Sequence, residues 1–112
     1  MKPASDIKSI IEEILRFRNG RDWEKFHDGR NLAISLNVEA SELLELFLWK
    51  QSHEIDVDKL EAELADVFYA AFLIADKYGL DVKRIVRNKL RKNAKKYPIS
   101  KFKGSNRKYD ES

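Results

Sequence analysis

Two pairs of acidic residues interrupt apolar segments of the chain, and the members of each pair are three residues apart. The pairs are Glu39 with Glu42 and Glu63 with Asp66. On a helix, side chains at this spacing project from one face. Carboxylates are rarely buried without a partner, because a buried unpaired charge is costly. Four carboxylates on two apolar helices therefore predict a bound cation.

The ligand types indicate which cation is expected. These side chains offer only oxygen, the chain has no cysteine, and neither of its two histidines is placed beside the acids. Oxygen ligands favour Mg²⁺, with Mn²⁺ as an alternative, over zinc or copper. Because Mg²⁺ is commonly bound by a few carboxylates together with substrate phosphates, the pattern predicts a nucleoside polyphosphate substrate. The metal would also lower the pKa of an attacking water.

Other interpretations of the acids fit the sequence less well than a metal site. Acid pairs of this spacing are frequent on helix surfaces, where they bind nothing, but the apolar surroundings of both pairs favour a site. A di-iron bundle combines glutamates with two Glu-x-x-His motifs. The chain has one such motif, Glu24 to His27, and it lies in a connecting segment. The chain also lacks a GxxxxGK[ST] loop, so a P-loop enzyme is not expected.

Aromatic and basic residues could complete a nucleotide site. Trp23 lies in the connector between the first two expected helices, and Trp49 follows the first acid pair by about two turns on the same face of a continuous helix. Trp23 either plugs the edge of the core or forms a wall of a pocket, whereas Trp49 could stack on a nucleobase or pack at an interface. Lys89, Asn93 and Tyr97 recur at i, i+4 and i+8. This stripe is either a solvated face or a phosphate-binding face.

Hydrophobic periodicity predicts four helices that position these residues. We expect them at about residues 6–20, 31–51, 58–78 and 81–96. The expected boundary residues are Ser5 or Asp6, Asn19-Gly20, Asp58, Gly79, Asp81 and Pro98. This pattern predicts an all-α fold, an antiparallel helical bundle of about four helices.

Length and composition limit the class of protein. A chain of 112 residues predicts one helical domain, with a helical core over about residues 5–97 and an irregular basic tail over 98–112. A domain of this size is small for a deep cleft, so we expect homo-oligomerisation to complete the site. No apolar run approaches the ~20 residues of a membrane span, and no signal segment is evident. We therefore expect a cytoplasmic protein without a membrane partner.

These residues resemble the all-α MazG-like nucleotide pyrophosphohydrolases, most closely their dCTP-pyrophosphatase branch. The resemblance extends from about residue 7 to residue 109. Its anchors are RDWEKFH at 21–27, EASELLELFLWK at 39–50, ELAD at 63–66, Lys89 with Asn93, Tyr97-Pro98, and RKY at 107–109. Several ordered motifs at family-like spacing make this resemblance more specific than a single acid pair.

The resemblance implies hydrolysis of a (deoxy)nucleoside triphosphate, dCTP or a related dNTP, to the monophosphate and pyrophosphate, an activity that cleans the nucleotide pool. By position, the Mg²⁺-binding and catalytic acids would be Glu39, Glu42, Glu63 and Asp66. The substrate-binding residues would be Trp23 and Trp49 at the base and sugar, and Lys89, Asn93 and Tyr97 at the phosphates. Glu42 or Glu45 would accept the proton of the attacking water. The family also implies a homodimer or a dimer of dimers.

The chain departs from its relatives around the expected base pocket. Asn37 and Ser41 replace small glycines beside the first acid pair, Ile14 stands where relatives carry a histidine, and Ala70 stands where they carry a tyrosine. These positions lie nearer the nucleotide than the metal. They therefore affect base preference more than the reaction.

A competing interpretation is a non-catalytic helical interaction module. It would use the basic segment from Lys83 to Lys103 to bind nucleic acid or a protein. The net charge of the whole chain is only +3, however, and the module leaves the acids among apolar residues without a role. A nucleic-acid partner is therefore not expected.

Overall fold

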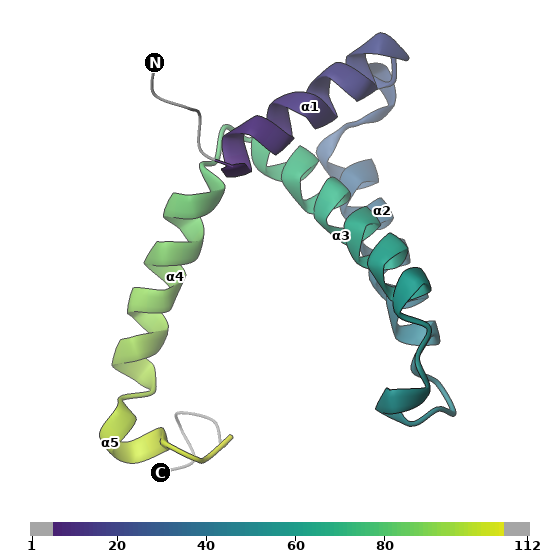
Figure 1. Cartoon of the computed structure of the whole chain (residues 1–112). Helices are drawn as coiled ribbons and strands as arrows, with labels where there is room; N and C mark the ends of the chain where they lie inside the picture. Colours follow the sequence, from purple (N-terminus) through teal and green to yellow (C-terminus); the bar gives the residue numbers. More distant parts are fainter. Residues whose placement is uncertain (1–5, 107–112) are drawn as a thin grey trace. The chain divides into compact units, whose positions relative to one another are not determined.

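The computed structural model describes residues 6–106. This part of the chain contains helices and turns but no strand, so the predicted all-α fold is confirmed. Its helices are α1 (Asp6–Gly20), the 3₁₀ turn η1 (Glu24–Phe26), α2 (Gly29–Glu45), the 3₁₀ turn η2 (Ser52–Glu54), α3 (Val57–Lys77), α4 (Val82–Lys96) and α5 (Ile99–Phe102). Figure 1 shows them coloured along the sequence. They form two compact units that divide after Leu80.

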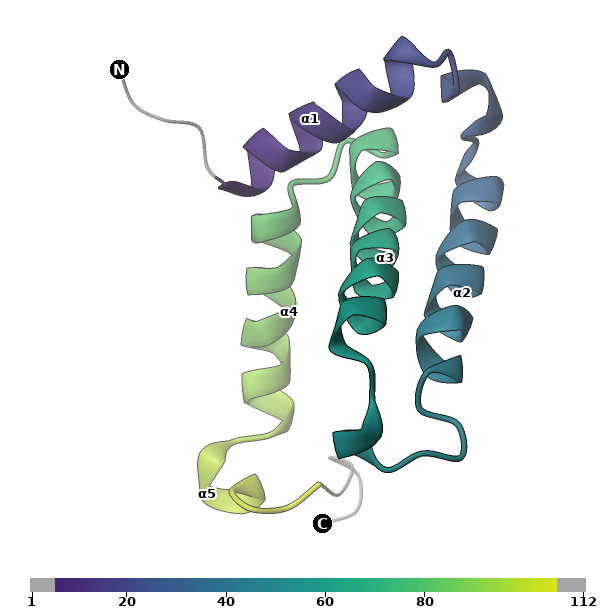
Figure 2. The same ribbon diagram turned by 45° about the vertical axis from the view of Figure 1, so that its right-hand side comes forward.

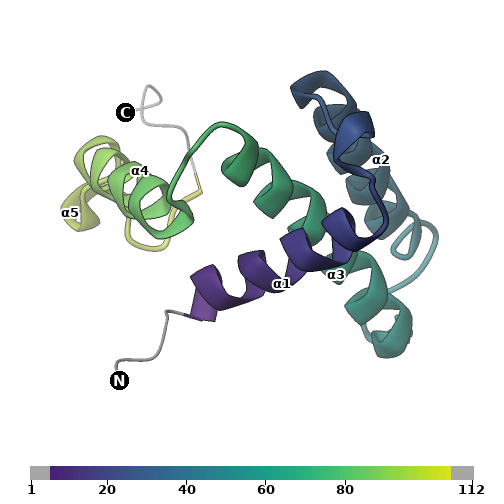
Figure 3. The same cartoon turned by 90° about the horizontal axis from the view of Figure 1, so that it is seen from above.

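The first unit contains α1, α2 and α3. Helices α2 and α3 run side by side in opposite directions (Figure 2), and α1 lies across α3 (Figure 3). Leu32 of α2 and Leu73 of α3 are almost fully buried, together with Ala70 and Ala75 of α3. This small core holds α2 and α3 together, and it places the two acid-bearing helices next to each other.

The helix starts are set by aspartate caps. Asp28 begins α2, since its carboxylate accepts a hydrogen bond from the Asn31 amide at 2.7 Å. Asp81 begins α4 in the same way, as predicted, by accepting from the amide of Arg84 at 3.1 Å. The prediction that Asp58 caps α3 is wrong by two residues. Asp56 has the extended backbone of a cap, and its carboxylate accepts from the Asp58 amide. Ser5, a predicted cap of α1, lies outside the described residues.

The helix ends agree with the sequence at α1 and α3 but not at α2. Helix α1 ends at Gly20, and Gly79, with φ of +65°, follows the end of α3. Helix α2 ends at Glu45, whereas the apolar sequence predicted a helix to about residue 51. The chain tightens there into i→i−3 hydrogen bonds, and Trp49 takes a left-handed φ of +65°. The prediction that Trp49 shares a helix face with the first acid pair is therefore wrong.

The second unit contains α4 and the short helix α5. The ring of Tyr97 meets the ring of Phe102 edge to face, with centroids 4.9 Å apart, and Pro98 precedes the first residue of α5. The segment from residue 98, predicted to be irregular, thus begins with one helical turn. Residues 107–112 of that segment lie outside the described residues. Across residues 6–106, none of the helices has the length and apolar character needed to cross a membrane.

Candidate active site

Three carboxylates from α2 and α3 meet where these helices pack together. One oxygen each from Glu39, Glu63 and Asp66 lie within 4.8 Å of one another. Glu39 and Glu63 are half-buried, and Asp66 is exposed. Glu42, half-buried one turn further along α2, is close enough to Glu39 and to Glu63 to share a hydrogen bond when one carboxyl is protonated. The structure thus brings together all four acids that the sequence predicted.

The acids destabilise one another's charged forms. Burial raises the pKa of Glu39, and the contact with Glu42 and the charges of its acidic neighbours raise it further. Burial is also the largest cause that raises the pKa of Glu63. The contact with Glu42 and the negative charges of its acidic neighbours, which include Glu45, raise that pKa further. Both shifts have the same sign, because each carboxylate is partly removed from water and faces other carboxylates. A cation at this point would relieve both effects.

The cluster also contains buried oxygens without partners. Oε2 of Glu39 and Oε2 of Glu63 are buried and accept no hydrogen bond. None of the ion pairs found among residues 6–106 joins any of the four acids to a lysine or arginine. Buried polar atoms without a partner are uncommon in proteins. Converging, unpaired carboxylate oxygens fit a hard divalent cation such as Mg²⁺ or Mn²⁺.

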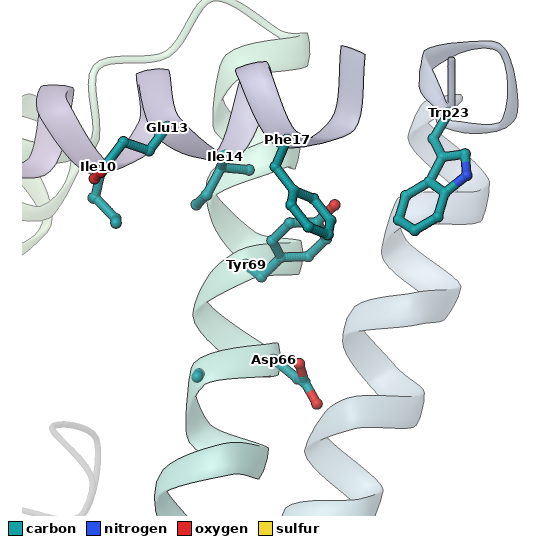
Figure 4. Close-up of a pocket in the computed structure, with 8 residues that line it drawn as sticks. Ile10, Glu13, Ile14, Phe17, Trp23, Asp66 and Tyr69 are labelled. Atoms are coloured by element: carbon teal, nitrogen blue, oxygen red, sulfur yellow. The ribbon is translucent and has the colours of Figure 1, made fainter. Parts of the chain in front are cut away.

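A largely apolar pocket adjoins the acids. It has a volume of about 560 Å³ and lies between α1 and α3, and Figure 4 shows its lining residues. These are Ile10, Glu13, Ile14, Phe17, Trp23, Ala65, Asp66 and Tyr69. Asp66 belongs both to this pocket and to the acid cluster, and it points from α3 toward α2 in the figure. A ligand in the pocket would therefore lie against the cluster, and the volume is typical of small-molecule sites.

Aromatic side chains form one end of the pocket. The ring of Phe17 meets Trp23 edge to face at 5.7 Å and Tyr69 at 6.4 Å (Figure 4). The Arg21 guanidinium lies 3.7 Å from the centre of the Phe17 ring, and it donates a hydrogen bond to the Phe17 carbonyl. The amide of Trp23 is bonded to the carbonyl of Arg18. Trp23 is thus held as a pocket wall, one of the two roles that the sequence left open.

Sequence reasoning missed a polar group behind this wall. Within residues 6–106, Arg18 is the one charged residue that is buried, with 6% of its surface exposed. Its guanidinium forms an ion pair with Glu24 at 3.8 Å. His27 Nδ1 and the Tyr69 hydroxyl are buried without hydrogen-bond partners. Burial, helped by the charge of Arg18, lowers the pKa of His27. Helical spacing offered one signal, since Arg18 continues the apolar stripe of α1 four residues after Ile14.

The remaining predicted substrate residues are not among those that line the pocket. Trp49 is fully exposed and does not line the pocket. Lys89 and Asn93 lie on α4 of the second unit, and Tyr97 directly follows the last residue of that helix. Their predicted roles at the base and at the phosphates stay predictions.

Comparison with known proteins defines the class of this helical, acid-bearing site. A model of the MazG-like family matches residues 34–111, which include all four acids. The chain belongs to the MazG-like family, and it is a nucleoside triphosphate pyrophosphohydrolase.

Individual relatives agree with this class. The chain is 35% identical to dCTP pyrophosphatase 1 of Rattus norvegicus, over 96% of this chain and 68% of the relative. It is also 35% identical to dCTP pyrophosphatase 1 of Homo sapiens, over 97% and 69%. Among solved structures, it resembles a pyrophosphatase from Archaeoglobus fulgidus with a TM-score of 0.81 and 30% identity. That match covers 88% of this chain and 97% of the archaeal one.

Proposed function

We propose that the chain hydrolyses dCTP or a closely related deoxynucleoside triphosphate to the monophosphate and pyrophosphate, using Mg²⁺ or Mn²⁺. The observation that carries this proposal is the convergence of Glu39, Glu63 and Asp66 beside an apolar pocket. Similarity to proteins named dCTP pyrophosphatase 1 supports the choice of nucleotide. Removal of unwanted nucleotides from the pool is the physiological role that we assign to the reaction.

The four acids divide the chemistry between them. Glu39, Glu63 and Asp66 would hold the metal, with Glu42 as a further ligand. When bound, Mg²⁺ supplies charge neutralisation for the phosphates and lowers the pKa of the attacking water. A carboxylate oxygen of Glu42 or Glu45 would accept the proton of that water. Glu45 is the last residue of α2, and its charge acts on Glu63, so it lies near enough for this role to be tested.

The pocket would hold the nucleoside. Trp23 and Phe17 offer aromatic surfaces on which a base can stack, and the isoleucines of α1 offer apolar contact. Because Asp66 belongs both to the pocket and to the acid cluster, a nucleoside bound in the pocket would have its phosphates next to the acids. Lys89, Asn93 and Tyr97 are proposed to bind the phosphates.

Self-association is part of the proposal. Few apolar side chains of the described residues are buried, whereas many large ones on α2 and α3 are exposed. The latter include Ile34, Val38, Leu44, Val57, Leu64 and Phe68. Exposed apolar residues gathered on adjacent helices are typical of an interface. We therefore assign a homodimer or a dimer of dimers, in which the fully exposed Trp49 could contact a nucleotide bound to a neighbouring subunit.

Product identification tests the reaction. The purified protein is incubated with each common dNTP and NTP, with Mg²⁺ and with EDTA, and the products are separated. Monophosphate and pyrophosphate, formed only with metal and fastest from dCTP, are expected. Diphosphate and orthophosphate as products would contradict the assigned cleavage site, and faster turnover of another nucleotide would contradict the preference for dCTP.

The family assignment replaces the interpretation of the chain as a non-catalytic module.

A further inference from the structure

The modest net charge of the chain conceals a division of charge between its two units. Residues 1–80 contain 10 of the 22 lysines and arginines and 16 of the 19 acids. Residues 82–106 contain ten lysines and arginines and no aspartate or glutamate. The overall charge argued against a nucleic-acid partner, but the second unit by itself is strongly basic. Eight of these ten residues lie on α4, and basic charge clustered along one helix is the usual footprint of phosphate recognition.

Three arginines share one face of α4. Arg84, Arg87 and Arg91 are spaced at i, i+3 and i+7, so they lie along about two turns, or roughly 10 Å, of the helix. They line a shallow hollow of about 220 Å³ together with Asp81, Lys83 and Asn88. The side-chain oxygen of Asn88 accepts a hydrogen bond from Arg91 at 2.8 Å, which holds that guanidinium over the hollow. We call Arg84, Arg87 and Arg91 the arginine face.

The arginine face carries uncompensated repulsion. Like charges three or four residues apart destabilise a helix, and exposed helices usually intersperse charges of both signs. Among residues 6–106, no ion pair involves the three arginines, and the only acid in the hollow, Asp81, is engaged in capping α4. A polyanion would remove this repulsion. Guanidinium groups also suit phosphates, because they offer paired donors in a fixed plane.

This face is separate from the predicted triphosphate-binding stripe. Lys89 and Asn93 lie about 140° and 180° around the helix from Arg84 at 100° per residue. The exposed large apolar residues of α4, which are Ile85, Val86 and Leu90, also lie off the arginine face. The arginine face therefore offers no large apolar side chain that could insert into a bilayer, which disfavours a membrane surface as its partner. A line of guanidiniums two turns long suits a repeating chain of phosphates better than one phosphate group.

We propose that the arginine face of α4 binds the phosphate backbone of nucleic acid without sequence preference, as a site additional to the nucleotide-hydrolysing one. The contacts are charge-assisted hydrogen bonds from the three guanidiniums to successive phosphates. Binding of this kind is salt-dependent, since each neutralised phosphate releases counterions.

Fluorescence anisotropy with a labelled single-stranded 20-nucleotide DNA of mixed sequence tests this site on the full chain. Three contacts predict a slope of log affinity against log salt of about −2, from roughly −0.7 per phosphate on a single strand. The variant Arg84→Gln/Arg87→Gln/Arg91→Gln should lose at least about tenfold in affinity at low salt and most of this slope. Its dCTP turnover should equal that of the wild type.

A matched variant separates this site from a bulk charge effect. Arg16→Gln/Lys59→Gln/Lys77→Gln removes the same charge from exposed positions of the first unit, and it should bind DNA like the wild type. Equal losses in the two variants, or no DNA binding by the wild type, would overturn the proposal. So would binding to anionic phosphatidylserine vesicles that depends on the arginines while DNA binding does not. If the glutamine variant fails to fold by circular dichroism, Arg87→Gln/Arg91→Gln replaces it, with the same outcomes.

Discussion

Glu39 of α2 and Glu63 of α3 present carboxylate oxygens within 4.8 Å of each other, and Oε2 of each residue is buried and accepts no hydrogen bond. The two residues are 24 positions apart, and the antiparallel packing of α2 on α3 brings them together. An arrangement of unpaired like charges does not stabilise a fold on its own. It is the expected structure of a site that is completed by a cation and a phosphate substrate.

Asp66 tests whether the cluster is catalytic. The change Asp66→Asn keeps the shape of the side chain but removes the charge that the metal would need, so turnover should fall by about 100-fold or more. Because Asp66 is exposed, the helical circular dichroism signal should not change. Asp76→Asn, on the exposed surface of the same helix, is the matched control and should retain activity. Full activity of Asp66→Asn would remove Asp66 from the site.

Trp23 tests the pocket as the nucleoside site. Base stacking on an aromatic residue is worth about 1–3 kcal/mol, so Trp23→Ala should raise KM for dCTP roughly 5- to 150-fold while kcat changes little. Steady-state kinetics separates the two parameters. An unchanged KM would show that the base binds elsewhere.

Trp49 tests whether a neighbouring subunit contributes to the site. Trp49→Ala should raise KM only if a neighbouring subunit places this exposed residue in the site, and the size of the assembly can be measured on the same samples.

The raised pKa values predict how stability depends on pH without metal. An acid whose pKa is higher in the folded state contributes stability that is fully present below its unfolded pKa and is lost as pH rises through its folded pKa. For Glu39 and Glu63, that window begins near the ordinary glutamate value and ends at the raised pKa. The melting temperature in EDTA should therefore fall across this window, and Mg²⁺ should restore it above the window.

His27 acts in the opposite direction and must be separated from the acids. Its lowered pKa means that stability is present above the ordinary histidine value and is lost as pH falls toward the folded value. Comparing the wild type with Glu39→Gln isolates the carboxylate contribution, since His27 is present in both. Identical pH profiles of the two proteins in EDTA would contradict the assigned origin of the effect.

Gly29 tests the packing that holds the start of α2. A Cβ at this position would overlap the Tyr78 hydroxyl at the end of α3. Because the Tyr78 side chain is exposed and its tip can turn aside, Gly29→Ala should destabilise the fold by less than about 1 kcal/mol, and Tyr78→Phe should recover part of that loss. Gly20→Ala is the control, since nothing lies within 4 Å of a Cβ there. Chemical denaturation measures all three, and a loss well above about 1 kcal/mol in Gly29→Ala would mean that Tyr78 is fixed in place.

The acids could be predicted from the sequence because the signal is local: spacing of three within an apolar helix. Trp49 could not be placed, because no glycine or proline marks the end of α2, and the last turn tightens within an apolar run. The pocket could not be predicted either. It depends on the way α1 crosses α3 and brings Phe17 against Tyr69, a contact between residues 52 positions apart. Periodicity in either helix alone contains no information about that crossing.

The metal site is tested most directly by the melting temperature of Glu63→Gln and the wild type, each in EDTA and in Mg²⁺, together with dCTP turnover. Removing one of the facing charges should raise the melting temperature in EDTA, reduce the further rise caused by Mg²⁺, and abolish turnover. A variant that is more stable but inactive is expected when the carboxylates of a metal site repel one another in the absence of the metal. A lower melting temperature in EDTA with Mg²⁺-dependent turnover intact would contradict the metal site.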